Sequence, residues 1–193
     1  RDLAAGDLDD IFTNNTATPT GIDAIDGYIP GLYAGQLIIL AARPGVGKTS
    51  LALQVANNLP GNSLFFSLEM PKQDIFARHL SGIAEVEAWK IDSGKVTDTE
   101  ARRVLDAQDK VKQTTNDLII VDKLSDVYSI INAIQRFNRR GKVSGVFIDY
   151  LQLMSGGRGE THNLRIADIT RRMKLAAMEY SVPFVLMSQL SRA

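Results

Sequence analysis

The chain has 193 residues and a mass of 21.2 kDa, the size of one ordinary domain with a single core. Lys plus Arg and Asp plus Glu each number 22, and hydrophobic residues make up 45% of the chain. This balance excludes a disordered chain, a collagen-like repeat and a basic protein that coats nucleic acid, and the absence of cysteine excludes disulfides and zinc knuckles.

Nothing in the sequence indicates a membrane or an exported protein. The longest aliphatic run extends only from Leu37 to Ala42, whereas a membrane helix needs about 20 apolar residues. No charged-then-apolar leader opens the chain. We therefore expect a cytoplasmic domain with no membrane partner.

Residues 1–19 are polar and predict an arm or linker from another domain. Three apolar side chains in this segment, Leu8, Ile11 and Phe12, suit a short helix that docks on a partner. The pattern becomes regular from Thr20, and we expect one folded domain over residues 20–193.

From there, short apolar runs alternate with helical patterns. The runs predict strands at 37–42, 63–68, 118–121, 145–150 and 183–187. Helical patterns cover 48–58, 71–82, 97–113, 127–137 and 166–180, with Thr97 and Glu100 spaced as a capping box. Trp89 is expected in the core. The alternation predicts an α/β fold, a mostly parallel sheet with helices on both faces.

The segment 41–50 follows the first predicted strand and opens a helix, the context that a P-loop requires. Gly45 and Gly47 allow the backbone to curl so that successive N–H groups point at phosphate oxygens. Lys48 supplies a positive charge for the β- and γ-phosphates, and the Thr49 hydroxyl suits Mg²⁺. Nucleotide binding is the function that these residues favour.

One position departs from the general P-loop pattern. Ala42 stands where glycine is usual, five residues before Gly47. Alanine serves there only if the position does not need a positive φ. The alternative interpretation is a glycine-containing turn followed by a chance Lys-Thr pair.

A carboxylate ends the predicted strand at 145–150. Asp149 follows an apolar run, and acids at the carboxyl ends of parallel strands lie where α/β sheets bind ligands. Beside a P-loop, Asp149 would hold Mg²⁺, through a water molecule. The alternative is an aspartate that caps the next turn.

Two further polar residues end strands. Glu69 follows the run at 63–68 and suits a base that activates water; alternatively, it is a charged loop residue. Gln189 follows the last run and suits a sensor of the γ-phosphate; alternatively, it is an exposed residue that starts a loop. Gly156–Gly159 is expected to form a mobile loop.

Taken together, these segments resemble the motor domain of hexameric replicative DNA helicases of the bacterial DnaB family and their phage-encoded relatives. The matching segments, in family order, are Thr20-Gly21, Gly31-Leu32, Ala41–Thr49, Phe65–Pro71, Ile148–Met154 and Ser188–Leu190. Ser-Leu-Glu-Met at 67–70 and Ile-Asp-Tyr-Leu-Gln-Leu at 148–153 are distinctive of the family, and alanine at position 42 is common in it.

The resemblance implies a RecA-like fold that hydrolyses ATP with Mg²⁺ at the subunit interfaces of a ring. It makes Glu69 the catalytic glutamate, Asp149 the magnesium-site aspartate and Gln189 the γ-phosphate sensor. The residues implied in nucleotide binding are Arg43, Pro44, Gly45, Val46, Gly47, Lys48, Thr49 and Ser50, with Thr49 also a metal ligand.

The resemblance also implies partners. Single-stranded DNA would lie in the central pore, held by loops after the strands of Asp149 and Gln189, here 155–163 and whatever follows Leu190. A homo-oligomer, a hexameric ring, is implied, as are a primase and a helicase loader contacted through other parts of the protein. The family's second DNA loop and arginine finger would lie beyond Ala193.

Two other functions remain open at this point. A RecA-like recombinase or filament protein would use ATP as a binding switch. A regulatory P-loop ATPase scaffold would not unwind DNA.

Overall fold

The computed structural model describes residues 16–114 and 116–190. Its centre is a 5-stranded sheet in the order β1-β5-β4-β2-β3, and every paired neighbour runs parallel. The strands are β1 (Leu37–Ala42), β2 (Asn62–Ser67), β3 (Leu118–Val121), β4 (Val143–Asp149) and β5 (Phe184–Gln189). All the predicted strands are therefore confirmed, with small shifts at their ends.

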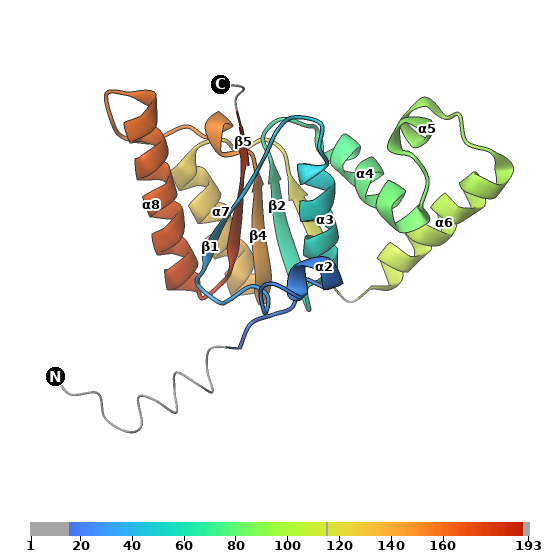
Figure 1. Cartoon of the computed structure of the whole chain (residues 1–193), viewed down its shortest axis with the longest axis horizontal. Coiled ribbons are helices and arrows are strands. Elements are labelled where there is room, and N and C mark those ends of the chain that lie inside the picture. Colours follow the sequence, from blue (N-terminus) through green and yellow to red (C-terminus); the bar gives the residue numbers. More distant parts are fainter. Residues whose placement is uncertain (1–15, 115, 191–193) are drawn as a thin grey trace.

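Helices cover both faces of the sheet, as predicted (Figure 1). The bounds are α2 (Asp23–Asp26), α3 (Lys48–Asn58), α4 (Lys72–Ala84), α5 (Ala88–Ser93), α6 (Asp98–Gln113), α7 (Val127–Arg140), the 3₁₀ turn η1 (Leu151–Leu153) and α8 (His162–Tyr180). Helices α7 and α8 pack on one face, and α3 packs on the other.

The alternation of side chains along β2 explains how one strand serves two cores. Leu64 and Phe66 are fully buried against α7 and α8, whereas Phe65 points to the α3 side and stacks on Phe147, with 6.2 Å between ring centroids. A continuous apolar run is what such a strand requires, because neither face is left to solvent.

Helices α4, α5 and α6 extend away from the sheet and have a small core of their own (Figure 1). The predicted capping box is present, since Thr97 accepts from the Glu100 backbone N–H and the Glu100 carboxylate accepts from the Thr97 backbone N–H. The expectation for Trp89 was wrong: it lies on α5, a short helix that the sequence pattern did not predict, and it is 56% exposed.

The first described residues are part of the folded body. Thr18 and Leu32 exchange two backbone hydrogen bonds of 2.8 Å, and Thr20 is buried. The short helix expected around Leu8, Ile11 and Phe12 lies outside the described residues. No helix in the described part of the chain is long and apolar enough to cross a membrane.

Candidate nucleotide site

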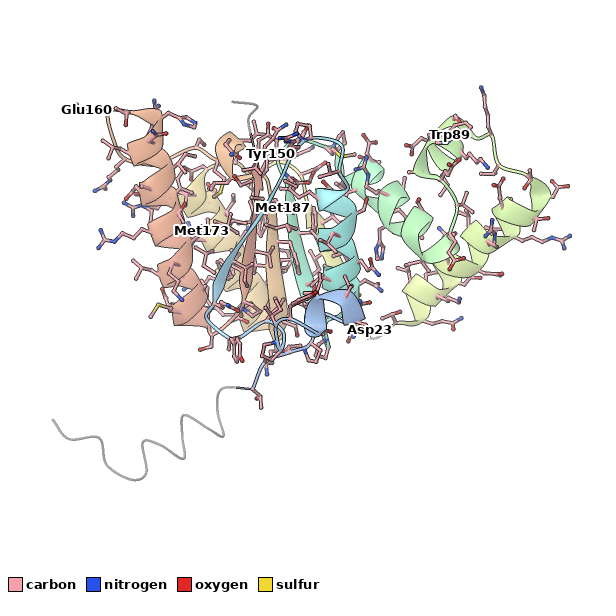
Figure 2. All side chains as sticks on the ribbon, in the orientation of Figure 1. Asp23, Trp89, Tyr150, Glu160, Met173 and Met187 are labelled. Carbon is pink, nitrogen blue, oxygen red and sulfur yellow. The ribbon has the colours of Figure 1, made fainter. Side chains whose placement is uncertain are left out.

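The carboxyl ends of the parallel strands meet at one edge of the sheet, marked by Tyr150 in Figure 2, with Asp23 at the opposite end. The P-loop leaves β1, Gln189 ends β5, Asp149 ends β4 and Glu69 follows β2. Because β1, β5, β4 and β2 are successive neighbours, residues distant in sequence come together at this edge.

The P-loop backbone has the geometry that its glycines predict. Gly45 has a φ of 79° and Gly47 a φ of 94°, both in the left-handed region. A Cβ at either position would meet no atom of the other described residues within 4 Å, so both glycines are required for backbone conformation rather than for a close contact. Ala42 lies in β1, paired with Gln189, so its position does not require glycine.

The start of α3 is suited to an anion. Gly47 is its N-cap, and no side chain of the described residues caps this helix end. The first backbone N–H groups of a helix have no partner within the helix and carry the positive end of its dipole. A phosphate in front of Gly47 would therefore meet oriented donors as well as the Lys48 ammonium.

Asp149 is the most informative residue of the site. It is 3% exposed, and its Oδ2 accepts a hydrogen bond of 2.5 Å from the Thr49 hydroxyl. Its Oδ1 is buried without a hydrogen-bond donor among the described residues, and Lys48 Nζ lies 3.7 Å away. A buried carboxylate oxygen without a donor is costly unless a cation completes it.

These oxygens fit Mg²⁺. The Thr49 hydroxyl and the Asp149 carboxylate are hard ligands, and no group of three or more His, Cys, Asp or Glu that could hold a metal exists among the described residues. Mg²⁺ typically takes one or two protein groups and completes its shell with water and substrate phosphates. The donor set therefore suits a metal that arrives with a nucleotide, rather than one held in a protein cage.

The turn that carries Glu69 is fixed on both sides. Ser67 Oγ donates to the Met70 carbonyl at 2.6 Å, and Leu68 N–H donates to the Asp149 carbonyl at 2.7 Å. Asp122, after β3, accepts from Lys72 N–H at 2.9 Å, and this bond lowers the pKa of the Asp122 carboxyl. The Glu69 side chain itself is exposed. Its backbone is held in place while its carboxylate stays accessible.

A cleft of about 460 Å³ joins these groups. It is lined by Arg43, Pro44, Gly45, Gly47, Lys48, Thr49, Ser50, Glu69, Met70, Arg78, Asp149 and Gln189. Every candidate site residue except Val46 lines it, and Val46 lines an adjoining cavity of about 580 Å³. The structure therefore brings together the residues that the sequence singled out.

Arg78 is the charged lining residue that the sequence did not indicate. It lies on α4, partly buried, between the buried residues Ile75 and His79. In the sequence, Arg78 resembles any charged residue that flanks the buried face of an amphipathic helix. Only the path of α4 in the folded chain brings Arg78 to the lining of the cleft, where its charge suits a polyanionic ligand.

The family model for the DnaB-like helicase C-terminal domain matches residues 17–193. A probable plasmid replicative DNA helicase of Chlamydia trachomatis is 36% identical over 180 residues, 91% of this chain and 40% of that protein. The replicative DNA helicase DnaB of Haemophilus influenzae is 37% identical over 188 residues, 92% of this chain and 39% of that protein. The chain thus spans about 40% of the length of these relatives.

Solved structures agree with this assignment. A DnaB-like replicative helicase, described with its interactions with primase, superposes with a TM-score of 0.86 at 25% identity, over 100% of this chain and 49% of the other. An ATPase domain gives the same TM-score and identity over 100% of this chain and 73% of the other. These likenesses confirm the predicted α/β, RecA-like architecture.

Proposed function

Because the chain belongs to the DnaB-like helicase C-terminal domain family, we propose that it is the ATP-hydrolysing motor domain of a replicative DNA helicase. The observation that carries the proposal is Asp149: a buried carboxylate with one oxygen bonded to the P-loop Thr49 and the other without a donor, facing the cleft that Glu69 and Gln189 line. That arrangement supports the binding of a nucleoside triphosphate with Mg²⁺.

Each group of residues in the cleft has its own role in this proposal. Lys48 and the backbone N–H groups of residues 43 and 45–50, which include the start of α3, would bind the phosphates. Thr49 and Asp149 would hold Mg²⁺, Asp149 through a water molecule. Bound Mg²⁺ would neutralise charge on the β- and γ-phosphates. Glu69 orients a water molecule for in-line attack on the γ-phosphorus and accepts its proton, while the bond to the ADP oxygen breaks.

Gln189 is proposed as the sensor of the γ-phosphate. It lines the cleft from the end of β5, next to Ala42 at the end of β1. An amide at that place gains a hydrogen-bond partner when the γ-phosphate is present and loses it after release. The loop that follows Leu190 would then respond to the state of the nucleotide.

The assembly and its partners are also part of the proposal. A homo-oligomer, a hexameric ring, would place an arginine of the neighbouring subunit against the cleft, which the exposure of Glu69 in the single chain allows. Single-stranded DNA would pass through the ring along the segment 155–163. Primase and a loader would bind through other parts of the full-length protein, in the cytoplasm.

The test is ATP hydrolysis and separation of a forked DNA duplex by the full-length protein, each measured with and without single-stranded DNA. We expect DNA-stimulated hydrolysis and ATP-dependent strand separation, both weakened by added salt. Strand pairing without separation would instead identify a recombinase or filament ATPase. An ATP hydrolysis rate that is the same with and without single-stranded DNA would identify a regulatory scaffold.

A further inference from the structure

We propose that Gln152 is a positioning residue that links Gln189 to the segment leading into residues 155–163. The inference rests on the proposed function, in which Gln189 faces the γ-phosphate and 155–163 faces DNA. Gln152 lies in η1, directly after β4, and takes no part in binding the phosphates or the metal as described above.

The sheet leaves a gap that Gln152 fills. The register of β4 with β5 runs from Val146 opposite Phe184 to Ile148 opposite Leu186 and ends there. β5 continues to Gln189, paired only with β1, while the chain after β4 turns into η1. The last residues of β5 therefore have no registered backbone partner on the β4 side.

The side-chain amide of Gln152 replaces that partner. Its Nε2 donates to the Ser188 hydroxyl at 2.9 Å and to the Gln189 carbonyl at 3.1 Å, and its Oε1 accepts from Gln189 N–H at 3.3 Å. A carboxamide presents one acceptor and donors in the same way as a peptide group, so it continues the ladder. Glutamate has the same shape but cannot donate, and it would face the Gln189 carbonyl with a negative oxygen.

The segment after Gln152 is bonded to the body of the domain. Ser155 pairs with the start of α7, because its N–H donates to the Ser125 carbonyl at 2.9 Å and its carbonyl accepts from Val127 N–H at 3.0 Å. A shift of Gln189 would therefore reach 155 through η1, a short and hydrogen-bonded path.

The glycine loop that follows makes defined contacts with α8. Arg158 N–H donates to Asp168 at 2.9 Å, and Arg172 donates to the same oxygen at 2.8 Å. A Cβ on Gly157 would collide with the Arg165 carbonyl of α8. These contacts join the segment to α8, so a displacement at residue 155 would be passed on to the following residues rather than absorbed in an uncontacted chain.

The test compares Gln152→Ala and Gln152→Glu with wild type in the full-length protein. The measured quantity is the ratio of the Kd values for labelled oligo(dT) with ADP and with a non-hydrolysable ATP analogue. We expect a wild-type ratio of at least about fivefold, as is typical of coupled sites. Both variants should bring the ratio to within about twofold of one.

Two controls separate coupling from general structural damage. Gln36 lies at the opposite end of the sheet, and its side-chain oxygen accepts a hydrogen bond from Tyr33 N–H at 3.1 Å. Gln36→Ala therefore also removes a glutamine that is bonded to the backbone, but it should keep the wild-type ratio of Kd values. The double variant Gln152→Ala, Gln189→Ala should lower the ratio of Kd values no further than either single variant does, because both residues belong to the same coupling path.

Retention of the wild-type ratio in both Gln152 variants overturns the inference, as does an equal loss in Gln36→Ala. A wild-type ratio of one also overturns it, while the hydrolysis and unwinding assay decides the proposed function independently. A lowered melting temperature with an unchanged ratio would show a purely structural role for Gln152 and would overturn the inference too.

Discussion

At the residue scale, the two oxygens of Asp149 have different surroundings. One is bonded to Thr49, and the other is buried beside Lys48 at a distance too long for a hydrogen bond. The Lys48 ammonium also lies over the Tyr150 ring, 5.0 Å from its centroid. Charge, hydroxyl and carboxylate thus lie together at one end of the cleft.

Asp149→Asn should raise the Mg²⁺ concentration for half-maximal ATP turnover by about 10- to 100-fold, because an amide holds metal-bound water less strongly than a carboxylate. The measurement is a Mg²⁺ titration of ATP hydrolysis by the full-length protein. Asp109→Asn is the matched control, since Asp109 is exposed and bonded only to Lys112 in the described structure, and should leave the titration unchanged. An unaltered titration in Asp149→Asn would refute the metal assignment.

At the element scale, one carboxylate joins α5 to α6 beside the small apolar core that they share. Glu100 accepts from Lys90 Nζ at 2.7 Å and closes the capping box with Thr97. The Lys90 hydrogen bond, followed by the bonds from Thr97, lowers the pKa of Glu100 from 4.5 to about 2. A folded-state pKa below the unfolded value stabilises the fold above pH 4.5, and this stabilisation is lost as the pH falls toward about 2.

Glu100→Gln therefore should lower the melting temperature near neutral pH but not in acid. Glutamine keeps the capping-box geometry and loses only the charge that pairs with Lys90. The difference in melting temperature between wild type and variant should narrow as the pH falls from 4.5 toward about 2. A difference in melting temperature that stays constant from pH 4.5 to about 2 would contradict the lowered pKa of Glu100.

The elements also show what sequence can and cannot predict. The strands of Asp149, Glu69 and Gln189 are local patterns of apolar residues ending in a polar one, so both the strands and their terminal side chains could be predicted. Arg78 and Gln152 could not, because their roles depend on which helix faces the cleft and which strands are neighbours. Those facts are set by strand order, which no local pattern contains.

The same distinction explains the error for Trp89. Large aromatic residues are usually buried, but α5 belongs to a small helical extension with too little core to cover Trp89. The mobility of the glycine loop at 156–159 stays a prediction. The close approach of Gly157 to α8 is a further feature that composition alone does not reveal.

At the scale of the whole molecule, stability depends on the central strands packed on both faces. Phe65→Ala should destabilise the domain by about 3–5 kcal/mol, because it removes a fully buried ring stacked on Phe147. Phe76→Ala is the matched control: the same side chain on α4 is 37% exposed, and its loss should cost well under half as much. Denaturant unfolding of both variants gives the two losses in the free energy of unfolding. Equal losses would contradict the central role of Phe65 in the core.

The assignment of this cleft as the hydrolytic site is tested by ATP binding and turnover in the Glu69→Gln variant of the full-length protein. Glutamine keeps the shape of Glu69 but cannot accept the proton of the attacking water. We expect an ATP affinity close to that of the wild type and turnover lowered by at least about 100-fold, the usual contribution of a general base. Turnover near the wild-type rate would contradict the assignment of this cleft as the hydrolytic site.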